Sequence, residues 1–110
     1  MRLSESQSAV SVSGKRVRLS GERWSHIEAR HPELQGWRER VLEAVGNPNF
    51  VVGGRYGELL AVRSYLTTGR RVFLVVVYRE SSRDGFIITA YLTSDTDELE
   101  RREKLWPSRF

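Results

Sequence analysis

Residues 72–78 form the stretch that most restricts how this chain can fold. Apolar side chains occupy successive positions from Val72 to Val77, and an arginine stands on each side of the run. A strand that is apolar on both faces is typical of the centre of a sheet. Residues 58–66 and 86–93 are predicted as its neighbours, with a short fourth strand at 50–52. Because the turns between them are short, the pattern predicts an antiparallel meander.

Two helices are expected before these strands. Ser20 is a residue type that favours the N-cap position, so we predict the first helix over residues 21–30. His31 precedes Pro32, and a residue before proline is biased out of the helical region, which places His31 at or just past the helix end. Residues 37–45 repeat apolar side chains at helical spacing and predict the second helix. Only a few residues separate the two, which indicates a helical hairpin.

The predicted architecture is an α+β domain, with the N-terminal helical hairpin packed on one face of a four-stranded antiparallel sheet. Residues 15–110 make up this single domain, with a short edge strand at 15–19 and either a short C-terminal helix or a frayed tail over 95–105. Residues 1–14 are rich in serine and are expected to be a disordered tail. The helices are expected to cover Phe86, Ile88, Ala90 and Leu92, which leaves a second face for a ligand, bearing Arg63, Tyr65, Thr89 and Tyr91.

Composition narrows the chemistry that the chain can perform. There are no cysteines, which excludes a disulfide framework, a thiolate metal cage and a thiol nucleophile. The net charge is +4 and nearly all of the cations are arginines, whose planar fork suits phosphate, although a solvated arginine surface explains the same charge. We find no signal peptide and no apolar run of membrane-spanning length, so a cytoplasmic protein without a membrane partner is expected.

Both histidines of the chain, His26 and His31, fall within or next to the first predicted helix. No other side chain is expected to titrate near neutral pH, so acid–base chemistry at that pH would depend on this stretch. Helical spacing places His26 on the same side as Arg23 and Arg30, whereas His31 leans toward the apolar side. The two histidines are five residues apart, about 140° around a helix, which disfavours chelation of a metal. We therefore predict no metal and no cofactor.

The order of motifs resembles that of a known nuclease family. A strand is followed by S-x-E-x-W-x-H-I-x-x-R-H-P-E (residues 20–33), then by a helix ending in N-P (residues 47–48), and the strands end in G-F-x-I-T-A-Y-L (residues 85–92). This pattern is similar to the phage-associated nucleases of the barnase–EndoU–colicin–RelE (BECR) fold. The resemblance implies a metal-independent ribonuclease, in which the RNA 2′-hydroxyl attacks the adjacent phosphorus and leaves a cyclic phosphate.

The resemblance also implies roles for particular residues. His26 would be the acid or base, with His31 as the second candidate, and Arg63 would bind the phosphate. Thr89 and Tyr91 would donate hydrogen bonds to phosphate, or Tyr91 would stack on a base. Arg23, Arg30 and Tyr65 are the candidate substrate-binding residues. The implied partners are RNA, with tRNA among the candidates, and a cognate inhibitor protein if the chain is a toxin.

Structural roles explain several of these residues equally well. His31 is also suited to bonding a backbone carbonyl at the helix end, and Arg63 to an ion pair with Glu58 or Glu43. The alternative function is a non-catalytic module of the same fold that binds RNA or a protein. The position of the histidines distinguishes the two functions. A histidine within reach of Arg63 and Thr89 favours the enzyme, because a catalytic site requires such groups to converge, whereas dispersed residues favour the binding module.

Overall fold

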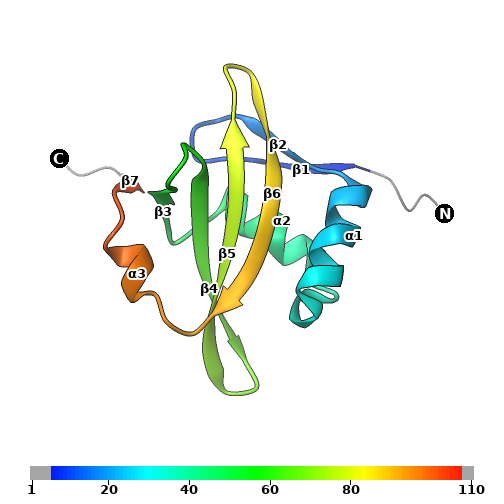
Figure 1. Cartoon of the computed structure of the whole chain (residues 1–110), viewed down its shortest axis with the longest axis vertical. Coiled ribbons are helices and arrows are strands. Elements are labelled where there is room, and N and C mark those ends of the chain that lie inside the picture. Colours follow the sequence, from blue (N-terminus) through cyan, green and yellow to red (C-terminus); the bar gives the residue numbers. More distant parts are fainter. Residues whose placement is uncertain (1–5, 108–110) are drawn as a thin grey trace.

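A seven-stranded mixed sheet, ordered β1-β2-β6-β5-β4-β3-β7, is the framework of the molecule (Figure 1). The structure is a computed structural model, and it describes residues 6–107. Among the described strands, only β2 and β6 pair in parallel, and the other neighbours are antiparallel. The strands are β1 (Gln7–Val10), β2 (Arg16–Leu19), β3 (Phe50–Gly53), β4 (Leu59–Thr67), β5 (Arg70–Glu80), β6 (Asp84–Thr93) and β7 (Lys104–Trp106).

The helices contact different parts of this sheet. They are α1 (Gly21–Arg30), α2 (Arg38–Gly46) and the single-turn α3 (Asp97–Glu100), and a 3₁₀ turn, η1 (Pro32–Leu34), follows α1. α2 lies across β1, β4 and β5, whereas α1 lies beside β6 at the side of the sheet. None of the helices in residues 6–107 is long and apolar enough to cross a membrane.

The predicted fold class was wrong. The meander from β3 to β6 is present, and β5 is its central strand. However, β1, β2 and β7 extend the sheet beyond four strands, and the parallel pairing of β2 with β6 makes it mixed. The two N-terminal helices contact different strands instead of forming a helical hairpin. The strand expected at 15–19 is present as β2, but it lies between β1 and β6 rather than at the edge. β1 and β7 are only four and three residues long and are held by their pairing in the sheet, a tertiary effect that local propensity does not report.

The expectation of a disordered tail over residues 1–14 is corrected as well, because Gln7–Val10 forms β1 and pairs antiparallel with β2. Two hydroxyls after β1 anchor the turn: Ser11 Oγ and Ser13 Oγ both donate to Glu80 Oε2, at 2.5 and 2.6 Å. The serines that suggested disorder therefore hold the N-terminal hairpin to the end of β5. Residues 1–5 lie outside the described residues.

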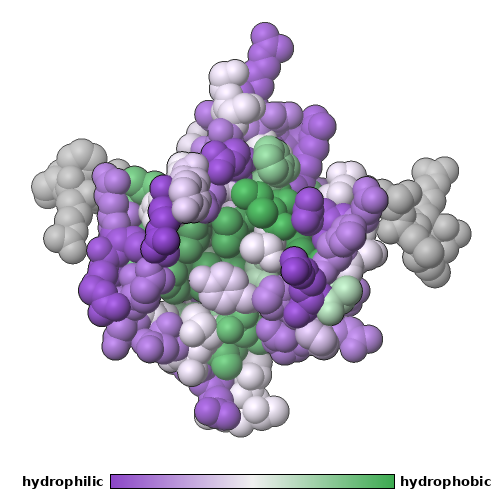
Figure 2. Space-filling model, viewed as in Figure 1, coloured by the Kyte–Doolittle hydropathy of each residue, from purple (hydrophilic) through white to green (hydrophobic). Residues whose placement is uncertain are grey.

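The sheet separates two apolar clusters. The rear cluster packs α1, α2 and η1 against one face and includes Trp24, Ile27, Val41 and Tyr78. The opposite face, which we call the front face, is turned toward the viewer in Figures 1 and 2 and carries Val62 and Val75 with Leu99 of α3. The short helix α3 thus covers part of the front face, and neither α1 nor α2 lies over it.

A β-bulge in β6 changes which of its residues face the helices. Val77 pairs with Thr89 and Tyr78 pairs with Ile87, so Ile88 is an extra residue without a partner in the ladder. The alternation expected for β6 therefore fails: Ile87 joins Ala90 in the rear cluster, and Phe86 is 54% exposed.

The predicted ligand face is also wrong. Tyr65 packs with the rear cluster, and Arg63 pairs with Leu74 of that cluster, so both lie on the α2 side of the sheet. Tyr91 belongs to the front cluster, and Thr89 pairs with front-face Val77. The four residues expected on one face are divided between two.

Candidate functional site

A cleft opens between α1 and the edge of β6, with a volume of about 550 Å³. β2 pairs with β6 only as far as Phe86, and the chain then leaves the sheet at Ser20 to form α1. Within residues 6–107, no strand pairs with this edge of β6 beyond Phe86, so α1 flanks an open strand edge. The residues that line this α1–β6 cleft are Arg23, His26, Ile27, Arg30, His31, Ile88 and Thr89.

Local rules determine how α1 presents its side chains to the cleft. The Ser20 hydroxyl caps the helix by accepting the Arg23 backbone N–H at 3.0 Å, which confirms the predicted N-cap. Trp24 and Ile27 are buried and fix the rotation of the helix against the core. His26 lies two positions after Trp24 and is exposed, which places it on the flank of the helix beside β6.

His31 closes the helix and stands at the other end of the same cleft. Its backbone N–H donates to the Ile27 carbonyl at 2.8 Å, which confirms its predicted position at the helix end. Its ring Nδ1 lies 3.5 Å from Glu33 Oε2, an arrangement in which a carboxylate can orient an imidazole. His26 makes no hydrogen bond or ion pair within residues 6–107, so its ring is free to meet a ligand.

The α1–β6 cleft is basic. Arg23 and Arg30 stand beside the two histidines, and no aspartate or glutamate of the described residues lines it. A concave site with cations on one wall favours an anionic ligand. Its other wall consists of Ile88 and Thr89, so the bulge brings an apolar side chain and a hydroxyl to the basic helix.

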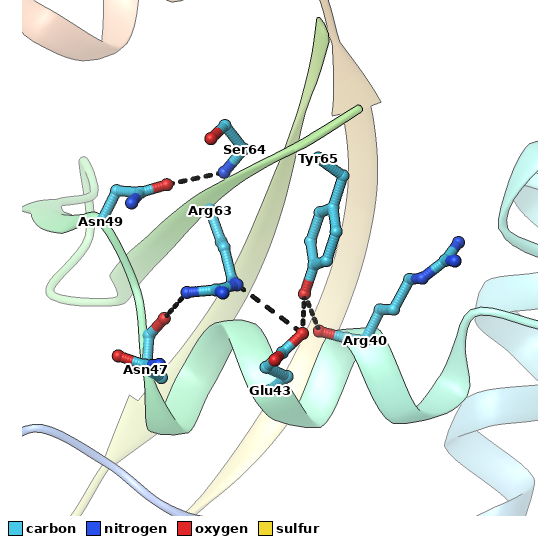
Figure 3. Close-up of polar contacts among 7 residues, drawn as sticks. All are labelled: Arg40, Glu43, Asn47, Asn49, Arg63, Ser64 and Tyr65. Carbon is cyan, nitrogen blue, oxygen red and sulfur yellow. Dashed lines mark hydrogen bonds and ion pairs between the residues drawn. The ribbon is translucent and has the colours of Figure 1, made fainter. Parts of the chain in front are cut away.

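Arg63 and Tyr65 belong to a separate group, the α2–β4 cluster, formed with Arg40, Glu43 and Asn47 (Figure 3). Arg63 Nη1 donates to the Asn47 carbonyl at 2.6 Å, and its Nε lies 3.6 Å from Glu43 Oε1, as the ion-pair alternative predicted. The guanidinium thus satisfies a carbonyl at the C-terminal end of α2 and joins this helix to β4. None of these residues lines the α1–β6 cleft.

The Tyr65 hydroxyl completes the α2–β4 cluster. It donates to Glu43 Oε1 at 2.5 Å and lies 3.3 Å from the Arg40 carbonyl oxygen. Burial and the Glu43 carboxylate raise the pKa of Tyr65 above its usual value. Its ring meets Trp37 edge-on at 5.4 Å, and the Arg40 guanidinium lies 4.5 Å from the centroid of the Trp37 ring. These contacts assign Tyr65 to the packing of α2 on the sheet rather than to an open binding face.

Tyr91 lies on the front face, in the same strand as Thr89 and on the same side of the sheet. Burial is the first cause that raises the pKa of Tyr91, followed by the charge of Glu98, while Arg102 opposes the rise. Tyr91 therefore lies within the electrostatic reach of the segment that contains α3 and β7.

A second cleft, of about 670 Å³, lies on the front face between β3 and this segment. Phe50, Val52, Glu100, Arg102 and Lys104 line this α3–β7 cleft. Sequence reasoning missed it because Phe50 and Lys104 are far apart in the chain, and residues 95–105 were expected to form a helix or a frayed tail. The β3–β7 pairing that joins them has no local signal beyond the apolar Leu105 and Trp106.

Five of the eight predicted site residues therefore meet in the α1–β6 cleft: Arg23, His26, Arg30, His31 and Thr89. Arg63 and Tyr65 lie in the α2–β4 cluster, and Tyr91 lies on the front face. Within residues 6–107, no group of three or more histidine, cysteine, aspartate or glutamate residues is arranged to hold a metal ion. No protein-family model, curated protein or solved structure matches this chain.

Proposed function

We propose that this protein is a small metal-independent RNA endonuclease that cuts in the α1–β6 cleft. The observation that carries the proposal is the convergence of two imidazoles with the guanidiniums of Arg23 and Arg30 along one cleft. RNA contains its own nucleophile, the 2′-hydroxyl, so such an enzyme has only to transfer protons and stabilise charge. The resemblance of residues 20–33 and 85–92 to phage-associated nucleases supports the same reaction class.

The reaction requires one base and one acid. One imidazole of the pair His26 and His31 removes the proton of the 2′-hydroxyl, and the 2′-oxygen forms a bond to the adjacent phosphorus. The bond from phosphorus to the 5′-oxygen breaks, and the second histidine, as imidazolium, donates a proton to that oxygen. The products are a 2′,3′-cyclic phosphate and a free 5′-hydroxyl. Imidazole suits both tasks because it gains and loses a proton near neutral pH.

The remaining polar residues of the α1–β6 cleft bind the phosphate. The guanidiniums of Arg23 and Arg30 offset the charge that builds up on the phosphoryl oxygens, and the Thr89 hydroxyl donates a hydrogen bond from the β6 side. Arg63 is left out of this proposal, because its guanidinium is bonded to the Asn47 carbonyl and paired with Glu43.

The setting that fits this activity is a phage, mobile-element or toxin-like ribonuclease acting in the cytoplasm. Its substrate is RNA, with tRNA among the candidates, and a cognate inhibitor protein would restrain a toxin of this kind. A basic cleft suits such an inhibitor as well as RNA, because an acidic segment would occupy the same cations.

The test is incubation of the purified protein with mixed tRNA and structured RNA in excess EDTA, followed by analysis of the fragment ends. We expect cyclic phosphate ends from the wild-type chain. His26→Gln and His31→Gln each lower the rate at least about a hundredfold, because each removes one proton-transfer group. Ser25→Ala is the matched control, since Ser25 is an exposed residue of α1 that does not line the α1–β6 cleft.

Two results would contradict the proposal. Cleavage that survives in the variant lacking both histidines excludes them from the mechanism. RNA that is bound but never cut favours the alternative, a non-catalytic binding module. The binding module is supported by one observation: His26 has no partner within residues 6–107 that would orient its ring for proton transfer.

A further inference from the structure

The front face has the surface of a site for unstacked bases. Figure 2 shows apolar side chains in a hollow at its centre, between hydrophilic side chains over α1 on one side and over α3 and β7 on the other. Phe73, Val77 and Tyr91 are the partly buried residues of β5 and β6 packed against the front cluster, so each also keeps some exposed surface. Flat apolar bases stack on such a surface, aromatic rings above all.

The α3–β7 cleft lies at the edge of this surface, on the side away from α1. In it, Lys104 Nζ lies 5.6 Å from the centroid of the Phe50 ring. Lys104 is exposed and makes no ion pair within residues 6–107, whereas Arg102 Nε is held by Glu98 Oε2 at 2.9 Å. The Glu100 carboxylate accepts the Thr96 hydroxyl at 2.6 Å. The cleft therefore offers an aromatic ring together with an available cation.

The two clefts stand at opposite ends of the exposed part of the sheet. Four strand spacings separate β6 from β7 in the order β6-β5-β4-β3-β7, which corresponds to roughly 19 Å. A few extended nucleotides cover such a distance, and cations at both ends with apolar side chains between them complement a polyanion whose bases are exposed. A duplex does not fit this arrangement, because its bases are paired inside the helix.

We infer that single-stranded RNA lies across the front face, from the α1–β6 cleft to the α3–β7 cleft. Phe50 and Lys104 hold a nucleotide a few positions from the phosphate that is cut, and Tyr91 contacts a base between them. This inference rests on the proposed function for the identity of the ligand. It adds that the substrate is unpaired and that a second site, distant from the histidines, determines its register.

The chain contains only two lysines, Lys15 and Lys104, which makes lysine modification a direct test. Lys15 lies in the β1–β2 turn, where its Nζ donates to the Ser81 carbonyl at 2.6 Å, and it serves as the internal reference. The probe is a 2′-O-methyl oligonucleotide of about six residues, which spans the face but lacks the nucleophile and stays intact. We expect this probe to protect Lys104 from acylation and to leave Lys15 reactive, and we expect a duplex of the same sequence to protect neither.

A pair of variants provides the second readout. Lys104→Gln should weaken binding of the same probe about threefold to tenfold. It should also make the slope of the logarithm of the association constant against the logarithm of the salt concentration shallower by about 0.7, the value for one phosphate contact in a single strand. Arg101→Gln removes the same charge from an exposed neighbour that does not line the α3–β7 cleft and should change the affinity less than twofold, because its charge makes no direct contact with the RNA and is screened by salt.

The two proposals fail separately. Cleavage of RNA with Lys104 unprotected overturns the inference and leaves the nuclease in place. Protection of Lys104 without cleavage supports the inference while rejecting the nuclease. Equal protection of Lys104 by the single strand and the duplex also overturns the inference, because the front face would then bind only the charge of the phosphate backbone.

Discussion

His26 and Tyr65 illustrate two kinds of polar side chain at the residue scale. His26 is exposed and has no bonding partner within residues 6–107, so its replacement should cost the fold little. Tyr65 is partly buried, and its hydroxyl meets both Glu43 and the Arg40 carbonyl. Both residues were predicted to belong to the site, but their surroundings differ: a ligand can reach His26, whereas Tyr65 is engaged in holding α2 to β4.

Tyr65→Phe should lower the free energy of unfolding by about 1 kcal/mol, because it removes a hydroxyl bonded to a carboxylate at a half-buried position. Urea denaturation followed by circular dichroism measures the change. Tyr56→Phe is the matched control, since Tyr56 is 74% exposed, and it should shift the free energy by less than about 0.5 kcal/mol. Equal effects of the two substitutions would mean that the Tyr65 hydroxyl contributes nothing to stability.

At the scale of elements, α1 and β6 together create the α1–β6 cleft. The basic residues of the cleft lie within α1, apart from His31, which is the C-cap of that helix. The bulged part of β6 forms the opposite wall. Bulges bend a strand and redirect its side chains, and they are common beside functional sites. The position of the helix follows from the early end of the β2–β6 pairing, since β2 is only four residues long.

Ser20→Ala should lower the free energy of unfolding by about 1 kcal/mol, because it leaves the Arg23 backbone N–H without its cap. Fraying would loosen the turn that carries Arg23, so a fall in the affinity for RNA should accompany it. Thermal or urea unfolding gives the first quantity and fluorescence anisotropy the second.

Ser25→Ala, within the same helix, is the control for the cap. Alanine has the higher helix propensity, so the stability of this variant should stay the same or rise slightly. If Ser20→Ala proved as harmless as Ser25→Ala, the capping bond would not stabilise α1.

At the scale of the whole molecule, three tyrosines make the free energy of unfolding depend on pH in the alkaline range. Tyr78 is 1% exposed, and burial raises its pKa to about 12, while the pKa values of Tyr65 and Tyr91 are raised mainly by burial as well. An unfolded tyrosine loses its proton near pH ~10. Above that pH the unfolded chain binds fewer protons than the folded chain, so the free energy of unfolding falls as pH rises.

We therefore expect stability to be independent of these tyrosines below pH ~9 and to decrease steadily between pH ~10 and about 12. Urea midpoints at one-unit intervals measure the slope, and Tyr78→Phe should make it shallower. A midpoint that does not move from pH ~10 to about 12 would contradict the assignment.

The sequence by itself determined the local elements. Ser20 and the His31–Pro32 pair defined the bounds of α1, and the apolar run at residues 72–78 identified the central strand. It also placed His26 on the side of Arg23 and Arg30, because side-chain spacing acts within a few residues, whereas the structure was needed to bring His31 into the same cleft. These short-range signals were sufficient to identify the helical wall of the α1–β6 cleft.

The tertiary structure alone decided which of these elements meet. The pairing of β3 with β7 brings Lys104 to Phe50, the bulge at Ile88 puts Ile87 instead of Phe86 on the helix side of β6, and the α2–β4 cluster removes Arg63 from the candidate site. Each depends on contacts between segments distant in the chain, whose formation is governed by the packing of the whole core rather than by local periodicity. For this reason the sequence predicted the residues of the helical wall of the α1–β6 cleft and Thr89 opposite them, but it predicted neither the bulge that brings Ile88 to that wall nor the α3–β7 cleft.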